Sequence, residues 1–222
     1  MQYHARFRST LTALSLLATV TLAQTDRLDS GSWEFKPYHG NRDQFTLDIP
    51  GTWTPFDQNP RASEGVIAFY SQSPIQPVAK DADPEEQAAK FRKLAEGLVS
   101  GAVPSFWAER SKAGKGMSCT GFSEQAQAKK VKYFAKGTAR GQRAKITGQP
   151  DVSKIEFAGC QGLRVLMHAD IPGSPGLTML AYSATADNVN YDFILLNEPS
   201  YLEQNRLWFE RIMTTVKLTG AR

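Results

Sequence analysis

A run of basic residues is the feature of this sequence whose residue types and spacing best suit binding chemistry. Between Glu124 and Asp151 the chain has no acidic residue and seven lysines and arginines. The segments "KVKYFAK" (130–136) and "RAKIT" (143–147) alternate basic and apolar residues, which predicts two strands joined as a hairpin. The register that puts both apolar sets on one face gathers the charges on the other. The predicted binding face comprises Lys130, Lys132, Lys136, Arg140, Arg143 and Lys145.

Two interpretations of this predicted basic face stay open. Lysines on an exposed edge hairpin protect a sheet from pairing with the strands of other molecules. The same charges would also dock the protein on an acidic partner protein or on an anionic surface of the cell envelope. A nucleic-acid partner is not expected, because the chain without its first 23 residues has 24 basic and 22 acidic residues and is nearly neutral.

No catalytic, cofactor or metal motif is present, so the sequence predicts no catalytic residues, no cofactor and no metal. Nucleophile elbows, phosphate loops and dinucleotide fingerprints are all missing. The two histidines after the first 23 residues, His39 and His168, have no metal-ligand spacing around them. The alternative function is a small hydrolase or lyase of the cell envelope, with His168, Asp170 or Tyr182 as acid–base groups beside the last strands.

The first 23 residues have the pattern of an export signal. Arg6 and Arg8 precede an uncharged apolar run from Leu11 to Leu22, and the small residue Ala23 offers a cleavage position. The run is too short for a membrane span, which needs about 20 residues, and no later segment could span a bilayer. The sequence therefore predicts a secreted or periplasmic protein with one domain over 24–222.

The predicted export bears on the redox state of the two cysteines, Cys119 and Cys160. An oxidising compartment favours a disulfide between them, which would stabilise the fold by about 4 kcal/mol through loop closure. The alternative is a pair of buried free thiols. Spacing alone does not decide between the two, because disulfides require a specific geometry.

The remaining patterns predict the elements that position these residues. Strands are expected at 45–49, 65–71, 153–157, 162–169, 177–186 and 189–197, where apolar residues alternate or run continuously. Asp83 and Pro84 begin a predicted helix that ends near residue 100, and "SFWAER" (105–110) is expected to add a short helical turn. A last amphipathic helix is expected at 199–216. This order predicts an α+β fold in which helices cover both faces of a mainly antiparallel sheet of six or seven strands.

The same order resembles the PsbP/Mog-like α/β/α sandwich. The entry segment "FTLDIPGTW", the strand "VNYDFILLN" and the closing helix "FERIMTTVKL" carry the resemblance, which covers about residues 35–218. The resemblance transfers no active site, because its motifs are structural. It implies an exported, non-enzymatic binding or assembly module of unknown specific activity.

Overall fold

The computed structural model describes residues 33–40, 44–57, 64–71, 84–113, 119, 121–140 and 144–219. For residues 84–88, 90, 91, 139 and 140 it describes the backbone alone. The predicted export signal and the Asp83 cap lie outside the described residues.

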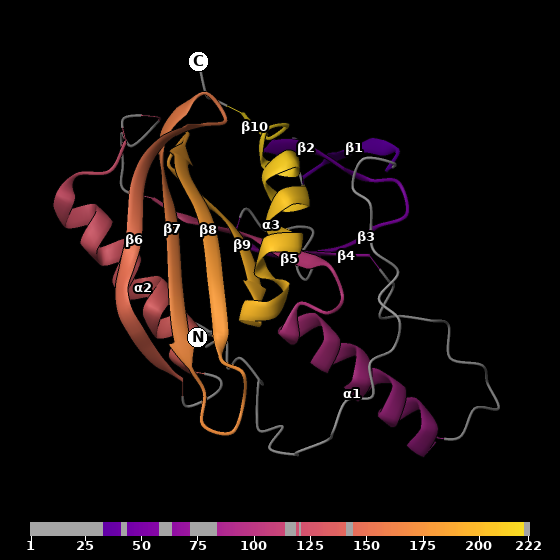
Figure 1. The fold of residues 1–222 in the computed structure, drawn as a ribbon. Helices are drawn as coiled ribbons and strands as arrows, with labels where there is room; N and C mark the ends of the chain where they lie inside the picture. The colour runs from indigo at the N-terminus through magenta and orange to yellow at the C-terminus, as the bar shows by residue number, and fades with distance from the viewer. Residues whose placement is uncertain are drawn as a thin grey trace, which may run out of the picture.

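A large antiparallel sheet dominates the fold (Figure 1). Its seven strands have the spatial order β3-β4-β5-β9-β8-β7-β6, and each neighbouring pair is antiparallel. Their bounds are β3 Thr54–Asp57, β4 Gly65–Tyr70, β5 Ser105–Lys112, β6 Lys145–Phe157, β7 Cys160–Asp170, β8 Leu177–Ala186 and β9 Val189–Asn197. The predicted mainly antiparallel sheet of six or seven strands is confirmed.

A second, smaller sheet is formed by the entry segment. It contains β1 (Phe35–His39), β2 (Phe45–Pro50) and the short β10 (Lys217–Leu218), in the order β1-β2-β10. The alternation predicted for β2 is confirmed, since Phe45, Leu47 and Ile49 are all buried. After Pro50 the chain turns and Trp53 packs against the helix residue Trp208, with ring centroids 4.9 Å apart. Trp53 is therefore a core residue.

Helices cover both faces of the large sheet. The helices are α1 (Pro84–Ser100), α2 (Glu124–Arg140) and α3 (Pro199–Met213). On one face, α3 and β2 pack into the larger core cluster through Phe209, Ile212 and Leu47, among others. The helix α2 covers the opposite face (Figure 1). There Phe134 packs in a second core cluster with residues of β7 and β8. None of the described helices is long and apolar enough to cross a membrane.

Two sequence-based assignments are wrong. Residues 130–136 belong to α2, so the predicted basic hairpin does not form, and only its second half becomes a strand, in β6. Residues 105–110 form part of an interior strand, β5, in place of a helical turn. In both segments the larger packing arrangement overrides the local pattern, because β5 fills the gap between β4 and β9 and α2 covers a sheet face that is itself apolar.

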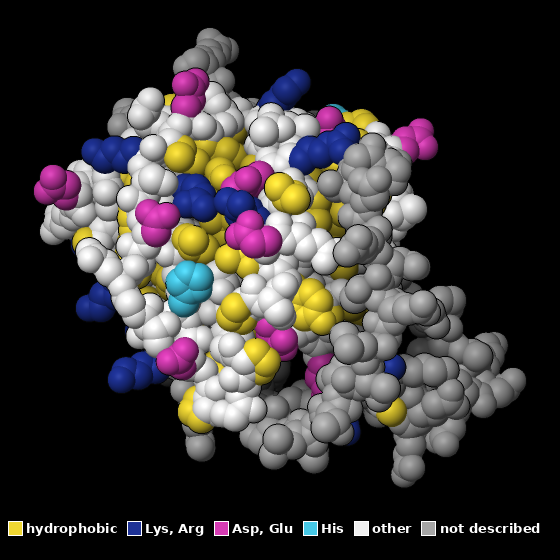
Figure 2. Space-filling view, in the orientation of Figure 1, with side chains coloured by type: hydrophobic (Ala, Val, Ile, Leu, Met, Phe, Trp, Pro, Cys, Tyr) yellow, Lys and Arg dark blue, Asp and Glu magenta, His cyan; other side chains and the backbone are white. Residues whose placement is uncertain are grey.

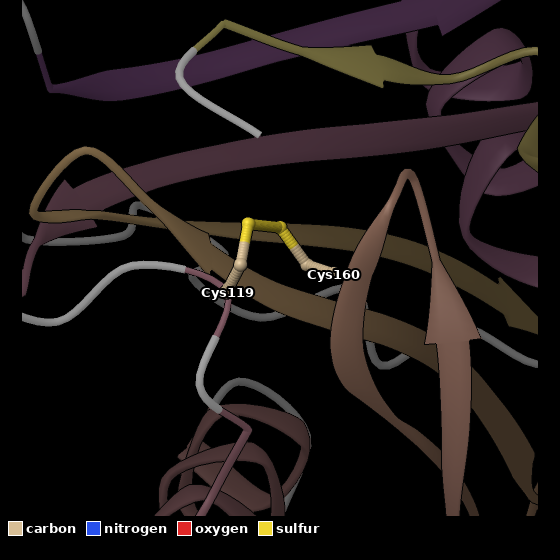
Figure 3. Close-up of a disulfide and its surroundings, with 2 residues drawn as sticks. All are labelled: Cys119 and Cys160. Atoms are coloured by element: carbon tan, nitrogen blue, oxygen red, sulfur yellow. A yellow bond between two sulfur atoms is a disulfide. The ribbon is translucent and has the colours of Figure 1, made fainter. Parts of the chain in front are cut away.

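The predicted disulfide between Cys119 and Cys160 is confirmed. Cys119 lies on the segment that leads into α2, and Cys160 directly follows the turn between β6 and β7 (Figure 3). The backbone N–H of Cys119 also donates to the carbonyl oxygen of Thr185 in β8, at 2.7 Å. The bridge thus fixes the start of α2 and the β6–β7 turn to the same end of the sheet.

A buried amide network joins the end of α1 to α3. The Nδ2 atom of Asn205 donates to the carbonyl oxygen of Gly101 and to Oδ1 of Asn197, both at 2.6 Å. The indole Nε1 of Trp208 donates to Oδ1 of Asn205 at 2.9 Å. Gly101 has a φ of +84°, and a Cβ atom there would lie 2.2 Å from Asn197 Oδ1. The network therefore requires glycine at this position.

We expect Gly101→Ala to lower the free energy of unfolding by about 2–4 kcal/mol, because it combines a positive φ with a collision inside the network. Gly137→Ala is the matched control, since a Cβ at this exposed position in α2 has no neighbour within 4 Å. It should raise the free energy of unfolding by about 1 kcal/mol through helix propensity alone. Urea unfolding of the oxidised protein measures both values, and equal changes in the two variants would contradict this account of the network.

Candidate functional site

The basic residues of α2 separate into an exposed face and a buried contact. The helix starts at Glu124, where Ser123 Oγ accepts a hydrogen bond from the N–H of Ala126 at 3.3 Å. Val131, Phe134 and Ala135 face the sheet, and Phe134 is 2% exposed. Lys129, Lys132 and Lys136 are exposed at spacings of three and four residues, which places them on one side of the helix. We call these three lysines the basic face of α2.

The structure keeps part of the predicted binding set together. Lys132 and Lys136 lie on the basic face, and Lys145 is exposed at the first position of β6, opposite Asp170 in the strand register. The side chain of Arg140 and all of Arg143 lie outside the described residues. Lys129 belongs to the face although it was not in the predicted set, and helical periodicity across 123–140 was the signal that could have identified it.

Lys130 is turned inward and does not contribute to the basic face. Its Nζ atom lies 2.8 Å from Oδ2 of Asp192, and the two side chains are 10% and 2% exposed. Ser183 Oγ donates to the other carboxylate oxygen of Asp192, at 2.5 Å. The ammonium group also lies 5.6 Å from the ring centroid of Phe134. These contacts anchor α2 to strands β8 and β9.

A second carboxylate lies beside this ion pair. Glu109 is opposite Asp192 in the β5–β9 register, and its Oε2 accepts a hydrogen bond from the hydroxyl of Tyr133 at 2.9 Å. Burial, and then the neighbouring Asp192 carboxylate, raise the pKa of Glu109. Burial and the nearby Glu109 carboxylate raise the pKa of the Tyr133 phenol. Burial therefore works against ionisation of Glu109, while two residues of α2 favour it, Tyr133 through its hydrogen bond and Lys130 through its charge.

This cluster positions a helix and does not form an accessible reaction site. Ser183 is fully buried, so its hydroxyl cannot contact a substrate. Asp192 has both carboxylate oxygens engaged, one by Lys130 and one by Ser183. Tyr133 is the exposed residue beside this cluster, and its side chain lies next to the basic face of α2.

Tyr182 lies apart from the other two candidate acid–base groups, His168 and Asp170. In the β7–β8 register His168 is opposite Thr178, whereas Tyr182 is opposite Arg164. That offset of four residues separates His168 from Tyr182 by roughly 13 Å along the strands. The Nδ1 atom of His168 lies 3.0 Å from Thr178 Oγ1, and Asp170 is an exposed residue at the end of β7. The alternative hydrolase or lyase site is therefore not assembled from these residues.

Tyr182 instead lines a groove on the α3 side of the sheet. The groove has a volume of about 900 Å³ and lies between the end of α3, the β6–β7 turn and β10. Figure 2 shows apolar side chains exposed among acidic and basic ones on this side of the molecule. The sequence did not reveal the groove, because its walls come from segments far apart along the chain. Within the described ranges, no three His, Cys, Asp or Glu side chains gather to hold a metal ion.

Comparison with known proteins identifies the fold. No family model and no curated protein matches the chain. The solution structure of cyanobacterial PsbP (CyanoP) from Synechocystis sp. PCC 6803 aligns with a TM-score of 0.50 and 12% identity, over 83% of this chain and 92% of that chain. The Ran-binding protein Mog1p of Saccharomyces cerevisiae aligns with a TM-score of 0.45 and 7% identity, over 84% of this chain and 96% of that chain. The alignment with cyanobacterial PsbP confirms the predicted PsbP/Mog-like fold.

We expect Asp192→Asn to destabilise the protein by about 3 kcal/mol, because it leaves the Lys130 ammonium buried without a counter-charge. Asp151→Asn is the control, since Asp151 also pairs with a basic residue, Arg164 at 3.2 Å, but is 63% exposed. The Asp151→Asn change should lower the free energy of unfolding by less than about 0.5 kcal/mol. Chemical unfolding at neutral pH measures the difference, and similar losses in both variants would contradict the anchoring role of the buried pair.

We expect Glu109→Gln to raise the Tm at neutral pH. The pKa of Glu109 is higher in the folded state than its ordinary value of 4.5, so the ionised side chain lowers the stability of the wild type above that range. As the pH falls through the folded-state pKa, the wild type takes up a proton and the advantage of the glutamine disappears. Thermal unfolding from pH 4 to pH 8 measures this. Glu64→Gln, at an exposed position, is the control and should leave the Tm at neutral pH nearly unchanged. A Tm gain for Glu109→Gln that persists at pH 4 would contradict the assignment.

Proposed function

We propose that this chain is an exported binding module that docks an acidic partner protein through the basic face of α2. The observation that supports the proposal is the arrangement of Lys129, Lys132 and Lys136, all exposed on one side of a helix. Tyr133 adjoins them and is 53% exposed, which adds an aromatic contact of the kind that is common at protein interfaces.

The charges of this face are not neutralised within the described part of the chain. Lys129, Lys132 and Lys136 make no ion pair with any described residue. Their field is therefore directed to the solvent, where it attracts an acidic surface and accelerates association. The inward contact of Lys130 with Asp192 holds the helix in place, so binding would not need to order the basic face first.

Edge protection does not account for these lysines. The interpretation required them to lie on an edge hairpin, but Lys132 and Lys136 lie on a helix, which has no free strand edge. Lys145 is the exception, because it lies on β6, an edge strand of the large sheet. Solvation of the helix surface remains the competing explanation, and the experiment below separates it from docking.

The proposal includes export and an oxidising location. Residues 1–23 act as a cleaved signal, the remaining 24–222 form one domain, and the mature protein resides outside the cytoplasm, either secreted or in the periplasm. The disulfide between Cys119 and Cys160 supports this location, because such bridges persist where the environment is oxidising.

We expect the triple variant Lys129→Glu, Lys132→Glu, Lys136→Glu to lose binding to an acidic probe. The probe is a fluorescein-labelled ten-residue peptide of glutamate and serine, and the readout is fluorescence anisotropy at low salt. The Kd should weaken at least about tenfold, because each reversal replaces an attraction with a repulsion. Raising the salt concentration should abolish the difference between wild type and variant.

The control variant is Lys93→Glu, Lys112→Glu, Lys154→Glu, which changes the net charge equally at three exposed positions on α1, β5 and β6. It should retain binding, with an unchanged circular dichroism spectrum in both variants. Equal loss in the two triple variants would show a net-charge effect and refute the docking face. Binding to phosphatidylglycerol vesicles without binding to the peptide would assign the face to a membrane surface, which also contradicts the proposal.

A further inference from the structure

Three of the four strand edges in this fold are short or carry a proline. Helices cover both faces of the large sheet, so its unpaired backbone groups lie along its edge strands. At one edge, β3 has four residues and includes Pro55. In the small sheet, β1 contains Pro37 at one edge, and β10 at the other has two residues. Short strands and prolines oppose pairing with the strands of other molecules.

The fourth edge, β6, lacks this protection in its second half. β6 has 13 residues and is the outermost strand at its side of the large sheet (Figure 1). Gly148, Pro150 and a shift in the pairing register with β7 all lie in its first half. The second half, "DVSKIEF" (151–157), has no proline or glycine and pairs with β7 in an unbroken register. We call residues 151–157 the β6 edge.

Every second residue of the β6 edge directs its backbone groups away from the sheet. Glu156 is opposite Gln161, but the N–H of Gln161 donates to the carbonyl oxygen of Cys119, at 3.4 Å. In an antiparallel ladder, hydrogen-bonded and non-hydrogen-bonded pairs alternate. Glu156, Lys154 and Val152 therefore belong to the non-hydrogen-bonded set with β7. Their N–H and C=O groups point to the free edge, where a further strand can pair with them.

The side chains at these outward positions carry two opposite charges and an apolar group. Lys154 and Glu156 are exposed and form no ion pair among the residues that the structure describes. Val152 is 36% exposed, which is unusual for a large apolar side chain in this protein. Ile155, between the two charges, lies on the other face of the strand and is partly buried against the larger core cluster. A further strand on this edge would thus meet both charge and apolar area.

A second copy of the same strand matches these positions. In an antiparallel pair with a two-fold axis at Ile155, Lys154 is opposite Glu156 of the second copy, and Glu156 is opposite its Lys154. Ile155 then contacts its own equivalent across the axis. A two-fold axis at Lys154 or at Glu156 would instead place like charges opposite each other, which destabilises a strand pair. A lysine alone would protect this edge, but the glutamate two residues later supplies its counter-charge in a second copy.

We propose that the protein forms a two-fold symmetric dimer in which the β6 edges of two copies pair as antiparallel strands with the axis at Ile155. Two ion pairs and the backbone hydrogen bonds of Lys154 and Glu156 join the copies. The two large sheets become one continuous sheet, and the unprotected edge of each is covered. The three lysines of the basic face of α2 are not part of the β6 edge, so the dimer does not depend on the docking function proposed above.

Charge reversal tests the pairing. Lys154→Glu and Glu156→Lys should each weaken the dimer Kd at least about tenfold, because each change turns both ion pairs into repulsions. An equimolar mixture of the two variants should form a heterodimer, since one copy then carries two acids opposite the two lysines of the other. Analytical ultracentrifugation measures these equilibria. Lys93→Glu and Glu64→Lys, at exposed positions outside the β6 edge, are the matched controls and should leave the Kd unchanged.

Cysteine cross-linking tests the register. Ile155→Cys should form a disulfide-linked dimer on mild oxidation, because residues opposite each other in a non-hydrogen-bonded pair have Cα atoms about 4.5 Å apart, which a disulfide can span. The two native cysteines are bonded to each other, so the new cysteine is the only free thiol. Val152→Cys is the control, since in this register the two copies of residue 152 lie roughly 20 Å apart along the strands and should not cross-link.

Three results would overturn the proposal: a wild type that sediments as a monomer at millimolar concentration, charge variants that stay monomeric when mixed, or cross-linking through Val152→Cys in preference to Ile155→Cys. The last result would show that the copies associate in another register. The dimer and the docking face also fail separately. The Lys154→Glu change in the control of the docking experiment would separate the copies but leaves the basic face of α2 intact, whereas loss of peptide binding in the α2 variant leaves the dimer unaffected.

Discussion

The fold is constrained by a sheet whose central strands are apolar on both faces. Nine of the ten residues of β8 are buried, so neither face of this strand can be left to water. On one face α3 and the small sheet supply the cover, and on the other α2 does so. Each covering element then presents its remaining polar side to solvent. The location of every candidate binding surface in this protein follows from that requirement.

The ion pair between Lys130 and Asp192 shows how the cover on the α2 side acquires a fixed orientation. A buried pair of this kind contributes little net stability, since desolvation offsets much of the attraction, but breaking it is costly. It therefore selects one orientation of α2 over others that would bury the same apolar area. In that orientation Lys129, Lys132 and Lys136 point away from the sheet. Lys130 is therefore buried, whereas Lys129, Lys132 and Lys136 stay exposed on the surface of α2.

The sequence predicted elements where one periodicity was unambiguous, as in α3 and β2, or where a helix start was explicit, as at Pro84. It failed at 130–136, because alternation in "KVKYFAK" fits a strand over seven residues, whereas the stripe through Val131, Phe134 and Ala135 indicates a helix only over a longer window. The burial of Lys130 was not predictable, since its partner lies 62 residues away. The groove lined by Tyr182 was missed for the same reason, because its walls meet only after the sheet has formed.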